Sequence, residues 1–241
     1  MFARRDQKNL ELEPAKPGEG RDIPILREEM VLVRKPLSQH AEQFRRLRNS
    51  IHALNPDGAS RSVLVTSALK GEGKSVAALN LALALTELPG IRVLLIDGNL
   101  QNPSIEHFLG LPRRQGFYEI LQGTITLDQA IRRTSVYQLD ILATGASPQL
   151  QSDFLNVDRI RAVLDAVKRS YDYVLIDASA ILAANHPSVM STVADGVLLV
   201  VRRGRTPRQY VEEAFAMIEN LGGNVLGTCL LGAFEPDQSS L

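Results

Sequence analysis

The sequence lacks several features that would mark other classes of protein. Among 241 residues there is one cysteine, Cys229, so no intrachain disulfide can form. Its apolar surroundings at 225–231 predict a buried strand residue rather than a reactive thiol. The four histidines show no metal-ligand spacing. Basic and acidic residues balance at 27 each, which argues against nucleic acid or an anionic membrane as the main partner.

Long apolar runs are also missing. No run is long enough to span a bilayer, and no signal peptide is recognisable, so we expect a cytoplasmic protein. Residues 1–36 are rich in charge, proline and glycine, without an apolar period, and are expected to form a mobile tail. Residues 37–231 are expected to form one domain, and residues 232–241 a short polar tail.

The domain alternates between two hydrophobic patterns. An amphipathic helix is predicted from Ser38 to Leu54. Short, nearly continuous apolar runs predict strands covered on both faces, at 63–66, 93–96, 139–142, 173–176, 197–201 and 225–231. Helical patterns lie at 75–88, 157–169, 187–193 and 207–221. This alternation predicts an α/β doubly wound fold with a mostly parallel sheet, of the P-loop NTPase type.

A phosphate-binding loop lies between the first strand and the helix that begins at Lys74-Ser75. Glycines allow the backbone N–H groups to approach a triphosphate, Lys74 adds positive charge, and the Ser75 hydroxyl can hold Mg²⁺. The order strand, glycine loop, helix makes the motif credible, although Ala68 replaces the glycine of the strict pattern. We therefore predict ATP and Mg²⁺ as cofactors, with the nucleotide bound by Lys70, Gly71, Glu72, Gly73, Lys74, Ser75 and Val76.

Two acids follow strands of the predicted sheet. Asp97 ends the run 92–96, and Asp177 ends the run 173–176. Ligands of open α/β sheets bind at the carboxyl ends of strands, where carboxylates can hold Mg²⁺. Asp177 looks like a Walker B aspartate and Asp97 like the acid of a second, Walker A′-type motif, although each alone could be a helix cap or a turn residue. Lys74, Asp97 and Asp177 are the predicted catalytic residues, and Ser75, Asp97 and Asp177 the predicted metal ligands.

Two resemblances follow from these motifs. Lys70 gives the pattern Lys-Gly-x-Gly-Lys-Ser, which resembles the deviant Walker A loop of plasmid-partition and division-site-positioning ATPases. In that class the extra lysine reaches phosphates in the partner subunit; a solvent-exposed loop lysine is the alternative. From about Gln39 to Leu231 the chain resembles the bacterial tyrosine autokinases of capsule and exopolysaccharide biosynthesis. The motifs that carry the resemblance are Glu42-Gln43-Phe44-Arg45-Arg46-Leu47-Arg48, Gly71-Glu72-Gly73-Lys74-Ser75, Val93-Leu94-Leu95-Ile96-Asp97 and Tyr171-Asp172-Tyr173-Val174-Leu175-Ile176-Asp177.

The autokinase resemblance implies an assembly. In that family a Glu-x-x-Arg-x-x-Arg helix joins neighbouring subunits, so the resemblance assigns oligomerisation to Glu42, Arg45 and Arg48. The alternative is a solvated helix face with ion pairs within the helix. It also implies a homo-oligomer activated by a membrane polysaccharide co-polymerase, a chain-length regulator, which would recruit the protein to the inner face of the membrane. Nucleic acid is not expected as a partner.

The chain departs from the autokinase pattern at the acids. The usual Asp-x-Asp-x-Arg reads Asp97-Gly98-Asn99-Leu100-Gln101, a later acid is replaced by His186, and the last tyrosine is Tyr210. The resemblance implies a protein-tyrosine kinase that transfers the γ-phosphoryl group of ATP, with Asp97 taking the proton of the acceptor hydroxyl. A catalytically weak or inactive ATP-binding scaffold of the same machinery is one alternative, and a partition- or positioning-type ATPase switch is another.

Overall fold

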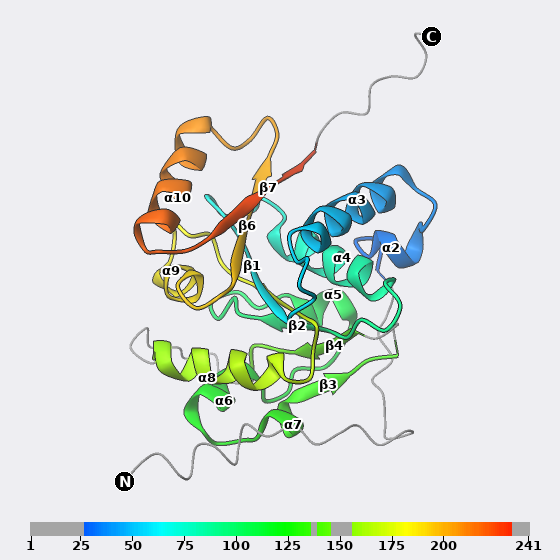
Figure 1. Cartoon of the computed structure of the whole chain (residues 1–241), viewed down its shortest axis with the longest axis vertical. Helices are drawn as coiled ribbons and strands as arrows, with labels where there is room; N and C mark the ends of the chain where they lie inside the picture. The colour runs from blue at the N-terminus through cyan, green and yellow to red at the C-terminus, as the bar shows by residue number, and fades with distance from the viewer. Residues whose placement is uncertain (1–26, 136–138, 146–155, 233–241) are drawn as a thin grey trace.

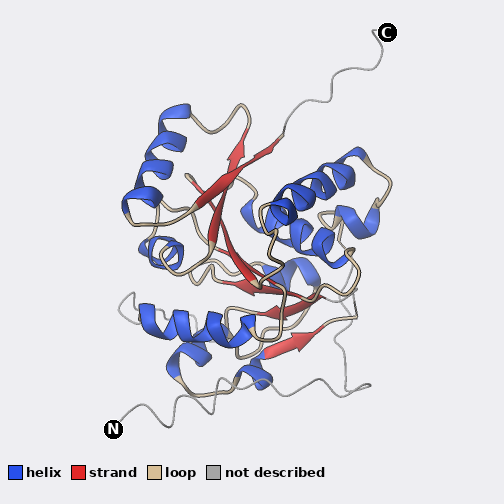
Figure 2. Cartoon of the chain, viewed as in Figure 1, coloured by secondary structure: helices blue, strands red, loops and turns tan. Residues whose placement is uncertain are grey.

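The computed structural model describes residues 27–135, 139–145 and 156–232, to which all structural statements refer. At its centre is a seven-stranded sheet in the order β3-β4-β2-β5-β1-β6-β7 (Figures 1 and 2). The strands are β1 (Arg61–Ser67), β2 (Val93–Asp97), β3 (Ile131–Arg133), β4 (Leu139–Leu142), β5 (Tyr173–Asp177), β6 (Gly196–Arg202) and β7 (Val225–Leu231). Neighbouring strands run parallel, apart from the antiparallel pair β3 and β4. The predicted mostly parallel sheet is confirmed.

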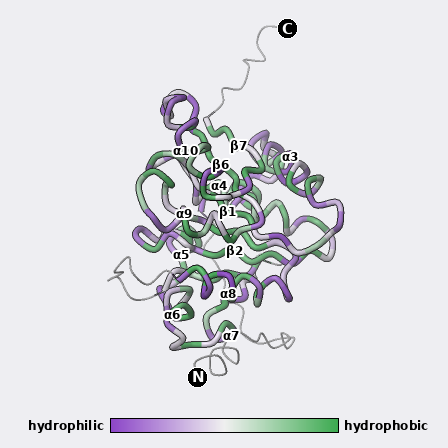
Figure 3. Tube along the Cα trace, turned by 60° about the vertical axis from the view of Figure 1, so that its left-hand side comes forward, coloured by the Kyte–Doolittle hydropathy of each residue, from purple (hydrophilic) through white to green (hydrophobic). Residues whose placement is uncertain are grey.

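Helices cover both faces of the sheet. One apolar cluster packs α2 (Val31–Arg34), α3 (Gln39–Ala53), α4 (Lys74–Thr86) and α5 (Ile105–Leu109) on one face. A second cluster packs α6 (Phe117–Gln122), α7 (Leu127–Ala130), α8 (Val157–Lys168), α9 (Asn185–Ser191) and α10 (Arg208–Asn220) on the other. Figure 3 shows the resulting pattern, with hydrophobic strands inside and more hydrophilic stretches along the outer helices. The three layers are those of a doubly wound α/β protein.

All six predicted strands and all five predicted helices are present, with ends shifted by at most a few residues. Cys229 lies in β7 and is buried, and burial raises the pKa of its thiol to about 11, as expected of an inert strand residue. The structure adds elements that were not predicted: the edge strand β3 and the short helices α2, α5, α6 and α7.

The mobile tail predicted for residues 1–36 is wrong in its last part. Helix α2 lies within that range, and Met30 and Leu32 are fully buried in the cluster beneath α3 and α4. The buried amide Nδ2 of Asn80, on α4, donates to the carbonyl of Glu29 at 2.6 Å. A polar side chain inside α4 therefore anchors this segment, a contact that no local pattern reveals. Residues 1–26 and 233–241 lie outside the described residues.

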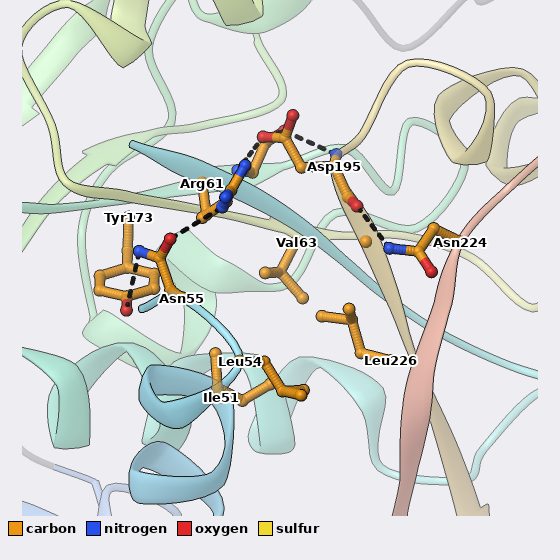
Figure 4. Close-up of a pocket in the computed structure, with 11 residues that line it drawn as sticks. Ile51, Leu54, Asn55, Arg61, Val63, Tyr173, Asp195, Asn224 and Leu226 are labelled. Atoms are coloured by element: carbon orange, nitrogen blue, oxygen red, sulfur yellow. Dashed lines mark hydrogen bonds between the residues drawn. The ribbon is translucent and has the colours of Figure 1, made fainter. Parts of the chain in front are cut away.

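A hydrogen-bond network joins β1, β5 and β6 at their amino ends, away from the predicted site (Figure 4). The Asp195 carboxylate accepts from the backbone N–H of Ser62 at 2.7 Å and from the Lys168 ammonium at 2.7 Å. Burial acts to raise the pKa of Asp195, but these bonds outweigh it and hold that pKa below its usual value. Arg61 donates to Asn55, which in turn donates to the Tyr173 hydroxyl. The cavity beside this network contains none of the predicted site residues.

Candidate nucleotide site

The predicted phosphate loop has the backbone that phosphate binding requires. It connects β1 to α4, and both of its glycines adopt left-handed conformations, with φ of +77° at Gly71 and +89° at Gly73. A side chain at either position would be strained. Gly73 is also the N-cap of α4, and its carbonyl accepts the first intrahelical bond, from Ala77 at 2.9 Å. The positive end of the α4 helix dipole therefore lies at the loop.

Glu72 holds the loop in place from inside. Its side chain is buried, and one carboxylate oxygen accepts the backbone N–H of Leu69 at 2.9 Å. The other oxygen accepts the hydroxyl of Thr206, from the segment between β6 and α10. Both oxygens of the Glu72 carboxylate are therefore used to hold the loop. Only the backbone of Glu72 is left to contact a phosphate.

The cations of the loop occupy different environments. Lys74 is 7% exposed, whereas Lys70 is exposed to solvent. Burial lowers the pKa of Lys74, and the negative charges of Asp177 and Glu72 counteract part of that effect. A buried ammonium beside two carboxylates retains its charge most readily when anionic oxygens approach it. Ser75 and Val76 follow in the first turn of α4 and are half-buried.

Asp97 and Asp177 end neighbouring strands in matched register, so they lie side by side at the carboxyl edge of the sheet. Asp177 is fully buried, and neither of its carboxylate oxygens accepts a hydrogen bond from the described residues. Burial, followed by the charge of Asp97, raises the pKa of Asp177 well above its usual value. Lys74 and the hydroxyl of Ser75 lower that pKa, although Ser75 is outside hydrogen-bonding geometry.

Asp97 is almost as buried, but its oxygens are partnered. Oδ2 accepts the backbone N–H groups of Ser104 at 2.8 Å and Ile105 at 3.0 Å, and Oδ1 accepts that of Asn99 at 3.1 Å. Burial raises the pKa of Asp97, and these hydrogen bonds moderate the increase. Asp97 is therefore held in one orientation, with a basicity above that of an exposed aspartate.

The residues present fit a magnesium ion. Two unpartnered, buried carboxylate oxygens on Asp177 cost free energy unless a cation or its water ligands approach them. Ser75 opens the adjacent helix, and Asp97 lies on the next strand. Mg²⁺ prefers a few protein oxygens together with water and phosphate oxygens, and the three predicted ligands match that preference.

The residues that depart from the autokinase pattern have different environments, and of these only Asn99 has a contact with Asp97, through its backbone N–H, among the described residues. Asn99 is half-buried, and its side-chain oxygen accepts the backbone N–H of Asn102 at 3.3 Å, whereas Gln101 is exposed. His186, at the start of α9, is buried; its Nδ1 has no partner among the described residues, and burial lowers its pKa. The side-chain oxygen of Asn99 therefore stabilises a turn within its own loop, at Asn102.

The three predicted oligomerisation residues lie on α3, apart from the phosphate loop. Arg45 makes a two-pronged contact with Glu87 at 2.8 Å, and Arg48 donates to the same carboxylate at 2.9 Å. Glu87 follows α4, so both arginines fasten α3 to α4 within one chain. The side chain of Glu42 is 53% exposed and lies 3.9 Å from Arg45. The three residues therefore differ in environment.

Two contributors to the loop's surroundings were not predicted. Thr206 reaches Glu72, and Leu231 lies so near that a Cβ on Gly73 would be 2.8 Å from its Cδ1. Both come from the last third of the chain. Thr206 precedes Pro207, and nothing in the local sequence indicates its contact with Glu72, because the two residues are far apart along the chain.

Comparison with known proteins agrees with this geometry. Residues 61–224 match the family described as AAA domain. The chain is 30% identical to the tyrosine-protein kinase YwqD of Bacillus subtilis (strain 168), over 84% of this chain and 85% of that protein. It is 31% identical to the succinoglycan biosynthesis transport protein ExoP of Rhizobium meliloti (strain 1021), over 86% of this chain and 27% of that protein.

A solved structure shows the same architecture. The crystal structure of the chimerical protein CapA2B2 superposes with a TM-score of 0.77 at 27% identity, covering 86% of this chain and 91% of that one.

Within the described residues, no helix combines the length and apolar character needed to cross a bilayer. Phosphate loop, paired acids, fold and relatives agree: the chain belongs to the bacterial tyrosine-protein kinase family of capsule and exopolysaccharide biosynthesis, within the P-loop ATPases.

Proposed function

We propose that this protein transfers the γ-phosphoryl group of ATP to a protein tyrosine and acts in exopolysaccharide or capsule biosynthesis or its regulation. The observation that carries the proposal is the meeting of the phosphate loop with Asp97 and Asp177 at one edge of the sheet. Family membership supports the choice of tyrosine as acceptor, and the similarity to a succinoglycan biosynthesis transport protein supports the process.

Each residue of the site then has a defined task. The backbone of the loop binds the phosphates, and Lys74 neutralises charge on the outer ones. Ser75 and Asp177, with Asp97 nearby, would hold Mg²⁺, which when bound offsets charge that develops on the phosphate oxygens. Asp97 accepts the proton of the tyrosine hydroxyl as the tyrosyl oxygen bonds to the γ-phosphorus. The bond between that phosphorus and the bridging oxygen breaks, and ADP leaves.

A partner protein is proposed from the same family relationship. We propose that a membrane polysaccharide co-polymerase activates the protein and brings it to the inner face of the membrane. ExoP supports this, because this chain matches only 27% of a protein named for transport. The remainder of such a protein is a reasonable source of the activating segment.

Labelled Mg·ATP tests the proposed function. We expect phosphotyrosine to form when the purified protein is incubated with a co-polymerase's cytoplasmic segment, and less without it. Asp97→Asn, which keeps the side chain's size and removes the base, should reduce phosphotyrosine by about a hundredfold. Nucleotide affinity, measured separately by calorimetry, should be retained.

The same assay separates the alternatives. Released phosphate without phosphotyrosine would indicate an ATPase switch, which the exposed position of Lys70 favours. Nucleotide binding with neither product would indicate a scaffold, favoured by the neutral Asn99 and Gln101. Either result would overturn the kinase proposal while leaving the nucleotide site intact.

We also propose that the protein forms a homo-oligomer through α3. Replacing Glu42, Arg45 and Arg48 together by alanine should shift the assembly toward monomer, because an exposed carboxylate can pair across an interface. The two arginines fasten α3 to Glu87, so the triple variant should also lose about 1 kcal/mol of unfolding free energy. Light scattering and urea unfolding measure the two effects.

Two further variants assign the effects to residues. Glu42→Ala alone should lower the assembly's mass and leave stability unchanged, whereas Glu87→Gln should lower stability and leave the mass unchanged. If the Glu42→Ala protein scatters light with the same mass as the unmodified one, α3 is not the assembly surface.

A further inference from the structure

A second cavity lies against α5, the helix whose first residue, Ile105, donates its backbone N–H to Asp97. It measures about 350 Å³ and is lined by Pro103, Glu106, His107, Leu111 and Arg113. None of these residues belongs to the phosphate loop or to the pair of acids. The lining is mostly polar or charged, so the cavity suits a polar side chain better than an apolar one.

The cavity has a fixed position relative to Asp97. The residues that follow Pro103, Ser104 and Ile105, donate their backbone N–H groups to Oδ2 of Asp97. One wall of the cavity is thus one residue away from groups that contact the proposed base. An acceptor segment with its tyrosine at Asp97 would pass this cavity within a few residues of the tyrosine.

A buried ion pair connects the two segments that line the cavity. Nη1 of Arg132 donates to Glu106 at 2.8 Å and to the carbonyl of Pro112 at 2.7 Å, with both charged side chains buried. The pair neutralises Glu106 and ties the chain just before Arg113 to α5. A guanidinium that bridges two segments in this way leaves little freedom to the loop that it holds.

The charge that remains at the cavity is positive. Arg113 is exposed, and no carboxylate of the described residues forms an ion pair with it. His107, also exposed, adds an imidazole on the α5 side. An arginine without an acidic partner and an imidazole line the same cavity, and both are donors that a carboxylate, with two acceptor oxygens, can pair with.

We propose that this cavity binds an acidic side chain of the acceptor segment, so that the protein selects tyrosines in acidic sequence. The inference rests on the proposed kinase function and adds the substrate class to it. Arg113 supplies the charge that recognises the acidic residue, His107 a second donor, and the Arg132–Glu106 pair the rigid wall. The contact fixes the register of the acceptor relative to Asp97.

The test measures binding without turnover. A fluorescent peptide with a tyrosine flanked by glutamates is compared with its glutamine counterpart by anisotropy, using the full chain saturated with a non-hydrolysable ATP analogue. The unmodified protein should bind the glutamate peptide about fivefold more tightly at low salt, and the advantage should shrink as salt is added. Arg113→Ala should abolish the preference, and Arg113→Glu should reverse it.

Arg161→Glu is the matched control. It makes the same change of charge at an exposed arginine on α8, which packs on the opposite face of the sheet, and should retain the preference. Equal affinity of the unmodified protein for the two peptides would overturn the inference, as would loss of preference in the control. Binding is scored without phosphotransfer, so a failure of the kinase assay and a failure of this test are distinguishable.

Discussion

Lys74→Met should abolish ATP binding or weaken it by about a hundredfold. Methionine keeps much of the bulk of lysine and removes the one buried positive charge of the phosphate loop. In the native protein that charge is desolvated and lies near Asp177 and Glu72, so it is already oriented toward the site. Without it, phosphates would approach two carboxylates with no compensating cation. Isothermal titration calorimetry with ATP measures the loss directly.

Lys70→Met is the matched control for that experiment. Lys70 lies four residues earlier in the same loop and is exposed. The resemblance to the partition ATPases implies that it contacts phosphates in a partner subunit, so its replacement should leave the affinity of a dilute, unassembled protein nearly unchanged. Thermal unfolding in the absence of nucleotide shows whether both variants fold. A folded Lys74→Met protein with unchanged affinity for ATP would contradict the assignment of the phosphate loop.

Asp177→Asn should change activity and stability in opposite directions. Burial and the charge of Asp97 raise the pKa of Asp177 well above 3.8, so the folded state binds its proton more tightly than the unfolded state does. Stability therefore falls as pH rises between the unfolded and folded pKa values, and at neutral pH this carboxylate is a net cost. The neutral amide removes that cost, and should raise the Tm by roughly 2–4 °C without nucleotide.

The same substitution should reduce Mg²⁺-dependent phosphotransfer by about a hundredfold, because the amide offers the metal one neutral oxygen in place of a carboxylate. Asp172→Asn, just before the first residue of the same strand, is the comparison, since its carboxylate accepts the N–H of Arg92 and takes no part in the site. A variant of Asp177 that keeps full Mg²⁺-dependent turnover would refute the role of this residue as a metal ligand.

Local patterns sufficed for much of the fold because most strands here are buried on both faces. Val93–Asp97 and Tyr173–Asp177 are buried at every position, and such runs are recognisable without neighbours. Strand β3 escaped prediction because its central residue, Arg132, is a buried charge whose partner Glu106 is distant in sequence. Helix α2 escaped because Asn80 anchors it from another helix.

Some residues of the candidate site could likewise be predicted from local sequence, and others could not. Gly71, Gly73 and Lys74 are recognisable from their spacing, since a phosphate cradle imposes it. The Asp97–Asp177 pairing required only that two strands be neighbours. The internal role of Glu72 and the attachment of Arg45 and Arg48 to Glu87 could not be predicted, because each depends on which side of a loop or helix packs inward.

The contact between Gly73 and Leu231 bears on how the protein is made. A ribosome completes the phosphate loop early, yet the side chain that packs against Gly73 belongs to the final strand, and the hydroxyl that binds Glu72 comes from Thr206. During synthesis, the contacts that surround the loop can therefore form only after most of the chain has emerged from the ribosome. Domains generally fold as units, and contacts of this sequence separation form late. A nascent chain truncated before β7 would carry every residue of the nucleotide motif without its finished shape.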